Sequence, residues 1–427
     1  MTHVGGLMPL RLLAVQLVRF VKIGPFLSQF RLWLWDCATK FPALSRNLLG
    51  VEIYEVCSTP SDAAESVQEV FPAEQSSVVY NLSFDDDRSF SAEQSEYPAL
   101  NVMSFKRASV LHNSRFNTVL AGNLLLIPAR IEKGPWSLYK GKKPRLVGGV
   151  KNQCNNYVAL KVQKNPRNIG TALFVGTRAP YNWYHWIANL LPALHVANQA
   201  EIEESIPLLL PEEISTSPQM RESLEIFLGN RPVVWLTKDE VVEVGNLLWV
   251  DSPVYDSPFA LDSANRLPLM LHSTAMREYR EKILSHYSEE IRAFNPVKRV
   301  FLARRPDSSR PYNQDEVLEH LLERGFQAVF AEDLTFGQQV ALFHGSEFIV
   351  GPTGAAFSNI IFSKPETRAL RLLDFSKPHE NFFSNLVLVG KSQIRDCYSL
   401  PTGTPSQVSG FSLNNRQLER AIEWLFQ

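Results

Sequence analysis

The chain has 427 residues, of which 45% are hydrophobic, and it carries 43 Lys and Arg against 44 Asp and Glu, a formal net charge of −1. The length exceeds what one hydrophobic core usually holds, and the apolar content excludes a largely disordered protein. The balanced charge argues against a nucleic-acid-binding protein, because such proteins need a basic excess to neutralise phosphates.

The first notable segment, residues 7–35, is apolar with basic positions at helical spacing. At about 100° per residue, Arg11, Arg19 and Lys22 fall on one face, opposite a broad face of Leu, Val and Phe. No run of 18 apolar residues occurs, so we expect no membrane-spanning helix. The pattern fits a helix on an anionic membrane surface, and it equally fits a helix docked on the protein's own core.

Residues 51–147 predict short strands at 51–56 and 78–80 and a small antiparallel region from 108, with turns at Ala121-Gly122-Asn123 and Lys133-Gly134. Asp85-Asp86-Asp87 contains the Asp-x-Asp pattern found in some metal–nucleotide sites. No glycine or helix start follows it to receive phosphates. We therefore interpret the triplet as a solvated turn and expect no metal site.

Two stretches of alternating strands and helices follow, joined by a long amphipathic helix over 276–291. The first stretch predicts strands at 171–175, 206–210, 232–236 and 247–250 and helices at 183–199 and 218–228, with Pro192 bending the first of these helices. The second predicts strands at 300–303, 326–330, 348–350 and 369–374 and helices at 313–324, 335–344 and 355–362. Thr335 and Gln338 have the spacing of a capping box at the start of the second of these helices. A terminal helix over 415–426 is placed to cross back and brace the first half.

These patterns predict an α/β protein with two Rossmann-like domains facing a cleft and an additional N-terminal α/β region. The expected parts are an N-terminal extension (1–107), containing the amphipathic helix and β-structure, and two Rossmann-like domains (108–270 and 271–427). In such sheets, ligands bind at the carboxyl ends of the strands.

One strand end, at residues 348–359, has the form of a phosphate site. The strand stops at Gly351-Pro352, and Gly354 opens an apolar segment of helical length. Free N–H groups at a helix start, with the positive end of the helix dipole, suit a phosphate or diphosphate. A tight turn in which the glycines serve only the backbone geometry explains the same residues.

A second strand end is followed by the polar and aromatic run Tyr181-Asn182-Trp183-Tyr184-His185-Trp186. Aromatic faces suit the C–H surfaces of a sugar, Asn182 suits hydroxyl groups, and His185 is a general-base candidate near neutral pH. The alternative is that the two Trp are core residues and His185 is a structural histidine.

Cationic side chains follow the strand at 300–303. Arg304 and Arg310, close to Asn313, would offset the charge of a leaving diphosphate without a metal. Asp374 follows the strand at 369–374, where a carboxylate can accept hydrogen bonds from ribose hydroxyls.

The order of these motifs resembles glycosyltransferase family 61 over about residues 110–395. The motifs are Asn182-x-Tyr184-His185-Trp186, Arg304…Arg310-x-x-Asn313, Glu332-x-Leu334-Thr335-Phe336-x-x-Gln339 and Gly351-Pro352-Thr353-Gly354-Ala355-Ala356-Phe357-Ser358-Asn359. The resemblance implies a GT-B-type, inverting, metal-independent hexosyl- or pentosyltransferase. It would move a sugar from a nucleotide-sugar co-substrate, with no other cofactor, to a glycan or glycolipid hydroxyl in surface or capsular polysaccharide synthesis.

The resemblance implies that 108–270 is the acceptor side and 271–427 the nucleotide-sugar side. It makes His185 the catalytic base and gives a set of substrate-binding residues: Asn182, Tyr184, Trp186, Arg304, Arg310, Asn313, Thr353, Gly354, Ala355, Asn359 and Asp374. Asp374 stands where the family commonly has Glu.

One departure concerns Thr353, which stands where the family usually has His. A hydroxyl can hydrogen-bond a phosphate or a sugar, but it supplies no titrating imidazole. The rival hypothesis is therefore a non-catalytic glycan- or nucleotide-binding scaffold of a polysaccharide assembly complex.

Four scattered cysteines without a CxxC pair give no disulfide framework and suit a reducing compartment. We expect a cytoplasmic protein, peripheral at the inner face of the membrane through residues 7–35, with no nucleic-acid partner.

Overall fold

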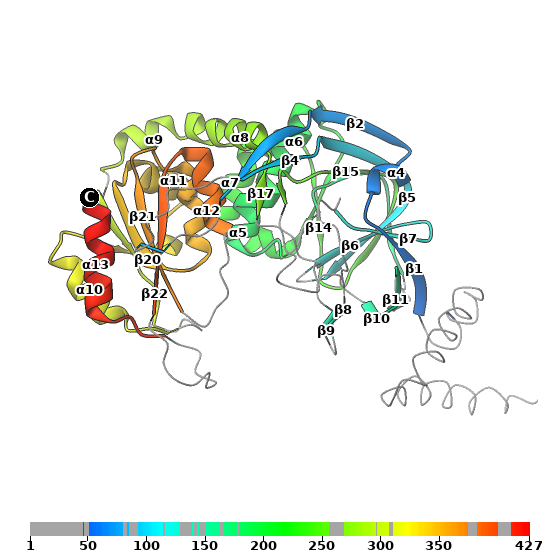
Figure 1. The fold of residues 1–427 in the computed structure, drawn as a ribbon. Coiled ribbons are helices and arrows are strands. Elements are labelled where there is room, and N and C mark those ends of the chain that lie inside the picture. Colours follow the sequence, from blue (N-terminus) through cyan, green and yellow to red (C-terminus); the bar gives the residue numbers. More distant parts are fainter. Residues whose placement is uncertain are drawn as a thin grey trace, which may run out of the picture.

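The computed structural model describes Arg46 and residues 51–427, except for 80–82, 85–92, 114–115, 129–138, 141–142, 145–149, 155, 162–164, 177–178, 256–268, 296, 307–310, 375–381 and 400–410. The predicted amphipathic segment 7–35, the Asp85–Asp87 triplet, the Lys133-Gly134 turn and Arg310 lie outside the described residues. Two sheets stand side by side with helices packed between and above them (Figure 1).

The first sheet is large, curled and mixed. In the described part of the chain it has eleven strands, in the order β10-β11-β1-β7-β6-β5-β15-β12-β13-β14, with β2 paired to β5. Strands β15, β12, β13 and β14 are parallel, whereas β5 pairs antiparallel with both β15 and β6. Their bounds are β1 (Val51–Cys57), β2 (Ser66–Phe71), β5 (Leu100–Asn113), β6 (Phe116–Ala121), β7 (Leu124–Leu126), β10 (Val150–Cys154), β11 (Tyr157–Lys161), β12 (Arg167–Phe174), β13 (Leu208–Pro211), β14 (Val233–Leu236) and β15 (Val241–Val250).

Three short hairpins and several helices complete the first half. The hairpins pair β3 (Glu74–Val78) with β4 (Glu93–Tyr97), β8 (Tyr139–Lys140) with β9 (Lys143–Pro144), and β16 (Val254–Tyr255) with β17 (Met270–Leu271). The helices are α4 (Pro60–Ala63), α5 (Trp183–His185), η2 (Trp186–Leu190), α6 (Leu191–Gln199), η3 (Glu212–Thr216) and α7 (Pro218–Leu228).

The second sheet is entirely parallel, with the order β19-β18-β20-β21-β22. This is the doubly wound order 2-1-3-4-5, in which the crossover direction reverses between the first and third strands, here β18 and β20. The strands are β18 (Arg299–Leu302), β19 (Gln327–Val329), β20 (Phe348–Pro352), β21 (Arg368–Leu373) and β22 (Gln393–Tyr398), and the helices are α10 (Gln314–Leu322), η5 (Ala331–Asp333), α11 (Phe336–Gly345), η6 (Ala355–Phe362), α12 (Phe382–Gly390) and α13 (Asn415–Phe426).

The terminal helix α13 corrects one expectation. Leu418, Ala421, Ile422 and Leu425 pack with α10 and the second sheet in one buried cluster. The helix therefore covers the outer face of its own sheet, at the left in Figure 1, and does not brace the first half. Its apolar residues at helical spacing predicted a buried face, but this spacing does not say which sheet lies opposite.

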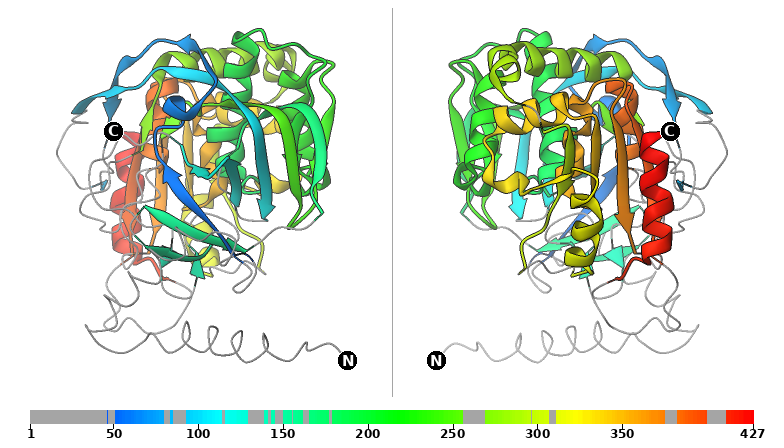
Figure 2. Two further views of the ribbon diagram at one scale, coloured as in Figure 1. Left: turned by 90° about the vertical axis from the view of Figure 1, so that its right-hand side faces the viewer. Right: turned by 90° about the vertical axis from the view of Figure 1, so that its left-hand side faces the viewer.

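The two halves share their main hydrophobic core. One cluster joins residues of α6 and α7 to residues of α11, α12, η6 and the second sheet. Helices α8 (Ser273–His286) and α9 (Ser288–Ala293) run along the top (Figures 1 and 2). Helix α8 adds Met276, Tyr279 and Ile283 to this cluster, and Ile291 of α9 packs against it. The predicted connector helix is thus a pair of helices built into the core.

The expectation of a mixed α/β protein is confirmed, but two separate Rossmann-like domains are not. The parallel strands of the first half continue through antiparallel strands into one curled sheet, and the cores of the halves merge. The boundary expected at 107/108 falls within β5, and that at 270/271 falls within β17. Among the described helices, none is long and apolar enough to cross a membrane.

Candidate functional site

The segment 182–186 begins a helix directly after the loop that follows β12. The Asn182 side chain accepts a hydrogen bond from the Tyr184 N–H at 2.9 Å and so caps the helix start. The helix predicted over 183–199, with a bend at Pro192, is divided by a π-helical turn, η2, closed by the Leu191 N–H on the Trp186 carbonyl. Pro192 stands just beyond this turn and has no N–H to continue the α-helical ladder, which accounts for the irregularity.

His185 is 7% exposed and is held by Asn189, one turn further along. Nδ1 of His185 lies 3.0 Å from Oδ1 of Asn189, and Nδ2 of Asn189 lies 3.5 Å from both Ser252 Oγ and the Val254 carbonyl oxygen. A carbonyl can only accept, so the Asn189 amide nitrogen faces Val254 and its oxygen faces His185. In the neutral ring, Nδ1 therefore carries the proton and Nε2 keeps the lone pair of a base.

Trp186 and Tyr184 are both buried. Trp186 is 0% exposed and donates its indole N–H to Ser223 Oγ on α7 at 2.8 Å. This burial fits the core alternative for Trp186 rather than direct contact with a sugar. The Tyr184 ring meets the His185 ring edge to face at 5.1 Å between centroids, and it meets Phe383 of α12 at 5.7 Å.

The ends of β18 and β20 meet at the point where the winding of the second sheet reverses. Gly351 is required there, because a Cβ atom would lie 2.8 Å from Cβ of Leu302. Arg304 follows β18, and its guanidinium donates to the Thr353 carbonyl. The Gln314 side chain fixes the Arg304 backbone, accepting from its N–H at 2.7 Å and donating to its carbonyl at 2.9 Å.

The turn 353–355 leads into η6, the helix predicted at this place. The first hydrogen bond at its start is donated by the Phe357 N–H to the Gly354 carbonyl, so the N–H groups of Ala355 and Ala356 precede the ladder. Gly354 has an extended backbone, with φ −176°, and a Cβ there would make only ordinary contacts at 3.7 Å. The fold therefore does not require glycine at 354, which leaves close approach of a ligand as a reason for it.

Other predicted donor residues have partners away from this turn. The Asn313 amide donates to the Leu413 carbonyl at 3.1 Å and to Glu316 at 2.6 Å, and it accepts from the Leu413 N–H at 2.9 Å. Asn313 thus fastens the segment before α13 to the start of α10. Asp374 follows β21 directly and is half-buried at the same edge of the sheet.

The segment 182–186 and the turn 353–355 come from different halves, and the structure brings them together. Trp183 Nε1 donates to Oδ1 of Asn359 on η6 at 3.3 Å. The Trp183 ring also packs edge to face on Phe336 of α11, at 5.8 Å between centroids. Asn359 is 0% exposed, and its amide nitrogen donates to Gln339 at 2.8 Å.

Two neighbouring polar residues escaped the sequence reasoning. Asn189 stands four residues after His185, a spacing that places both on one helix face, so this signal was present. Asp251 follows β15, and its Oδ2 accepts from the Asn101 N–H at 3.0 Å and Nδ2 at 3.1 Å. Burial raises the pKa of Asp251 to about 6, against the opposing effect of the Asn101 hydrogen bonds.

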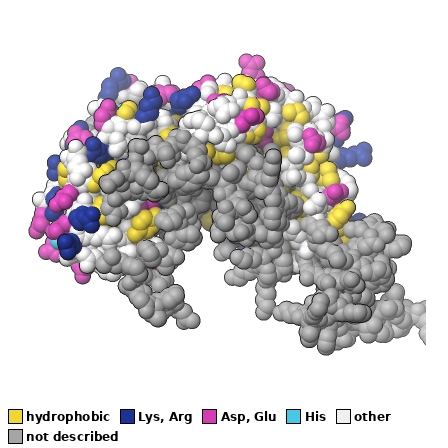
Figure 3. Space-filling view, in the orientation of Figure 1, with side chains coloured by type: hydrophobic (Ala, Val, Ile, Leu, Met, Phe, Trp, Pro, Cys, Tyr) yellow, Lys and Arg dark blue, Asp and Glu magenta, His cyan; other side chains and the backbone are white. Residues whose placement is uncertain are grey.

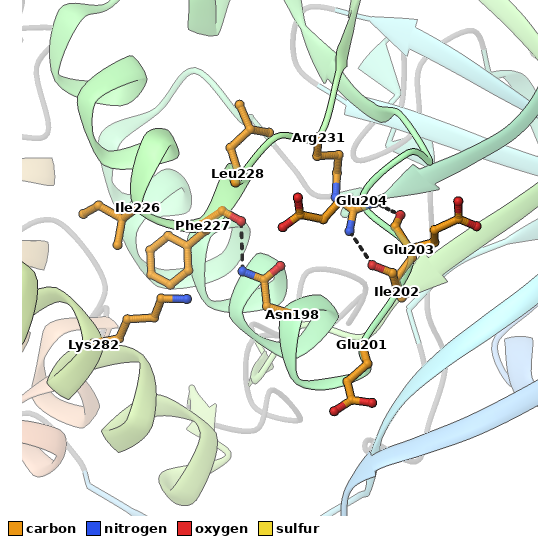
Figure 4. Close-up of a pocket in the computed structure, with 11 residues that line it drawn as sticks. Asn198, Glu201, Ile202, Glu203, Glu204, Ile226, Phe227, Leu228, Arg231 and Lys282 are labelled. Atoms are coloured by element: carbon orange, nitrogen blue, oxygen red, sulfur yellow. Dashed lines mark hydrogen bonds between the residues drawn. The ribbon is translucent and has the colours of Figure 1, made fainter.

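A cavity of about 500 Å³ lies elsewhere, at the ends of α6 and α7 beside Lys282 of α8 (Figure 4). None of the predicted site residues lines it. The guanidinium of Arg231 donates to the carbonyls of Ile202, Glu203 and Ile206, and Lys282 lies over the Phe227 ring at 5.0 Å. These cations stabilise the fold around the cavity.

The charge pattern of the described surface is mixed. On the face seen in Figure 3, Lys and Arg side chains alternate with Asp and Glu over the second half and the upper rim. Among the described residues, no three His, Cys, Asp or Glu side chains are grouped closely enough to hold a metal ion.

Comparison with known proteins bears directly on this region. Residues 183–370 match the family model described as Glycosyltransferase 61. This span includes the turn 353–355 and all of the segment 182–186 except Asn182. No curated protein matches the chain. The match supports the assignment of this chain to glycosyltransferase family 61, as the order of its motifs predicts.

Proposed function

We propose that the protein transfers a sugar from a nucleotide-sugar donor to a hydroxyl group of a glycan or glycolipid acceptor, with inversion at the anomeric carbon and without a metal ion. The observation that carries the proposal is the meeting of the segment 182–186 with the turn 353–355 inside the family-matched region. In a GT-B-type arrangement, one half supplies the base and the other the diphosphate site.

The donor diphosphate would lie at the turn 353–355. The N–H groups at the start of η6 and the guanidinium of Arg304 supply donors and positive charge to the leaving group. Thr353 and Asp374 would add a hydroxyl and a carboxylate beside this site. Arg310 and Asn313 remain proposed contacts from the loop between β18 and α10.

His185 would act as the general base. Nε2 takes the proton of the acceptor hydroxyl, and the acceptor oxygen attacks the anomeric carbon from the face opposite the diphosphate. The bond from that carbon to the diphosphate oxygen breaks, and the nucleoside diphosphate leaves with the electron pair. Asn182 is exposed at the helix start and would bind acceptor hydroxyls.

His185→Ala tests this assignment. A general base contributes roughly 10²- to 10⁴-fold, so we expect kcat to fall by that order while the Kd for UDP changes little. The acidic limb of the pH–rate profile should flatten, since a base must be neutral to act. Turnover preserved together with a lowered melting temperature would instead make His185 a structural histidine.

The rival function is a non-catalytic glycan- or nucleotide-binding scaffold, which Thr353 favours because the family usually has His at this place. A panel of nucleotide sugars, assayed for transfer and for donor hydrolysis, separates the two functions. Nucleotide binding with no turnover of any donor would support the scaffold. If the native chain turned over no donor and Thr353→His did, the missing activity of the native chain would be due to Thr353.

We further propose a cytoplasmic protein of surface or capsular polysaccharide synthesis that meets the inner face of the membrane through residues 7–35. Flotation with anionic liposomes of the intact chain and of a chain lacking residues 1–35 tests this contact. Equal flotation of both would contradict it.

A further inference from the structure

The third motif of the chain, Glu332 to Gln339, has no role in the transfer step described above. Structurally it covers η5 and the first turn of α11, which face the first half. From α7 of that half, the Gln219 amide donates to the carbonyls of Glu332 at 3.0 Å and Leu334 at 3.1 Å. The motif is thus a docking point between the halves.

From this docking point, a buried chain of amide groups runs to the segment 182–186. Gln339 Nε2 donates to the Ala331 carbonyl at 3.0 Å, and Gln339 Oε1 accepts from Asn359 Nδ2 at 2.8 Å. Asn359 Oδ1 then accepts from Trp183 Nε1 at 3.3 Å. Gln339 is 4% exposed and Asn359 is 0% exposed, so water does not replace these partners.

The direction of every hydrogen bond in this chain is determined. The Ala331 carbonyl can only accept, so the nitrogen of the Gln339 amide faces it and its oxygen faces Asn359. The nitrogen of Asn359 must then face Gln339, which leaves its oxygen toward Trp183. An indole N–H can only donate, so the last bond has the required partner. Reversing either amide would bring two donors or two acceptors together.

We propose that Gln339 is a positioning residue: by fixing the orientation of Asn359, it sets where Trp183 holds the segment 182–186 against the turn 353–355. Trp183 directly precedes Tyr184 and His185, so its indole N–H fixes the start of the helix that carries the proposed base. Asn359 lies four residues after Ala355 in η6. The same hydrogen bonds therefore fix the helix that carries His185 relative to the proposed diphosphate site. The consequence for turnover rests on the proposed function, whereas the hydrogen-bond chain itself does not.

The first experiment follows the indole N–H of Trp183 by NMR with ¹⁵N-indole labelling, and Trp183→Phe identifies its signal among the eight Trp. Gln339→Met keeps the length of the side chain but removes both the amide donor to Ala331 and the amide acceptor for Asn359. We expect the Trp183 signal to move in this variant, because the hydrogen-bond chain joins residue 339 to the indole through Asn359, while the signal of Trp235 on β14 stays in place. A folded Gln339→Met protein with an unchanged Trp183 signal would overturn the proposal.

Gln339→Glu is the conservative variant. Its carboxyl group, when protonated, can donate to the Ala331 carbonyl and still accept from Asn359, so at a pH low enough to protonate it Asn359 keeps its orientation and the Trp183 signal should remain close to that of the native protein. A signal displaced as far as in Gln339→Met would mean that the residue acts only through packing.

The second experiment uses Trp183→Phe, which removes the donor and keeps an aromatic ring on Phe336. One neutral hydrogen bond corresponds to about a threefold to tenfold effect, so we expect kcat to fall by that factor with an unchanged Kd for UDP. Trp235→Phe, the matched control, should change neither quantity. An unchanged kcat in Trp183→Phe would overturn the positioning role. If the native chain transferred no sugar, the proposed function would fail, and the NMR experiment would still test the chain of amides.

Discussion

Arg304 is the residue on which donor binding should depend most. Its backbone is fixed by Gln314, and its guanidinium bonds the carbonyl of Thr353 at the turn where the diphosphate would lie. Charge-assisted hydrogen bonds of this kind contribute about 1.5–3 kcal/mol, so Arg304→Ala should weaken UDP binding by roughly tenfold to a hundredfold. Isothermal titration calorimetry, with and without EDTA, measures the loss.

The adjacent Arg305 supplies the control for this prediction. Its guanidinium donates to Asp333 at 2.6 Å and lies over the Phe330 ring at 4.2 Å, on the side of β19. Arg305→Ala should therefore leave the UDP affinity unchanged. Equal losses in the two variants would show that general positive charge, and not the position of Arg304, governs binding.

Asp251 makes a prediction about stability and pH. Its pKa is about 6 in the folded protein, against an ordinary value near 3.8, because burial disfavours the charged carboxylate. The folded state therefore binds more protons at Asp251 than the unfolded state between these values, so the contribution of this residue to stability is fully present below pH 4 and is lost as pH rises through 6. One unit of pKa corresponds to about 1.4 kcal/mol, so a shift of about two units makes the loss on the order of 3 kcal/mol.

Asp251→Asn isolates this contribution. One oxygen of Asp251 accepts both hydrogen bonds from Asn101, so an amide oxygen at this place can keep them. We expect the variant to be more stable than the native protein at pH 7.5 and closely similar at pH 4, as measured by urea unfolding. A stability difference of the same size at both pH values would contradict the assigned titration.

At the scale of elements, the start of α11 shows how the halves are joined. Its four first-turn N–H groups are all satisfied. The Thr335–Gln338 capping box and the Thr335 carbonyl hold two of them, while Glu222 of α7 accepts from Phe336 at 2.7 Å and Gly337 at 2.9 Å. The Glu222 carboxylate also accepts from the Tyr287 hydroxyl at 3.0 Å. A carboxylate of the first half therefore caps a helix of the second.

Glu222→Ala should lower the free energy of unfolding by about 1–3 kcal/mol, because it leaves two helix N–H groups and a tyrosine hydroxyl without their acceptor. Glu225, exposed on the same helix, is the control, and Glu225→Ala should change stability by less than about 0.5 kcal/mol. Chemical denaturation of the three proteins gives the comparison. Equal stability of Glu222→Ala and the native chain would mean that the hydrogen bonds of Glu222 do not stabilise the contact between the halves.

Individual elements were largely predictable from the sequence because their signals are local. Helices α7 and α13 have the predicted bounds, and the capping box at Thr335 forms as its spacing indicates. The strands at 300–303 and 348–350 were found from apolar runs bounded by arginine or glycine. The π-helical turn before Pro192 was not predicted, because the sequence indicated only that the helix would be bent there.

Relations between elements were less predictable. The parallel strands of the first half were found, but their continuation into β5 and the strands before it depends on pairing between distant segments, which local patterns do not encode. The same limit applies to the site. His185, Arg304 and the turn 353–355 were proposed from their positions after strand ends, and the four-residue spacing from His185 to Asn189 was also visible. The contact of Gln339 with Asn359 was not, because it joins two different helices 20 residues apart.

At the scale of the whole molecule, the family-matched region is not a structural unit. Within residues 183–370, β15 has lost both of its neighbours, since β5 and β12 lie before residue 183. The region also omits β22, α12 and α13, which complete the second sheet and its cover. The shared core also contains residues outside this region, namely Val102 and Leu173 before it and Leu386 after it.

We therefore expect a protein of residues 183–370 to fail to fold cooperatively, because unpaired strand edges and uncovered apolar faces cannot be stabilised within it. The full chain, whose halves share one core, should melt in a single transition with a calorimetric enthalpy close to the van't Hoff enthalpy. Differential scanning calorimetry and dye binding to exposed apolar surface, measured on both proteins under the same conditions, test the two expectations. Two separate transitions in the full chain would mean that the halves unfold independently, and that the contacts of Glu222 and Trp183 join bodies that are stable apart. A cooperative transition in the 183–370 protein would mean that its strands find other partners and that the curled sheet is an addition to a smaller folded unit.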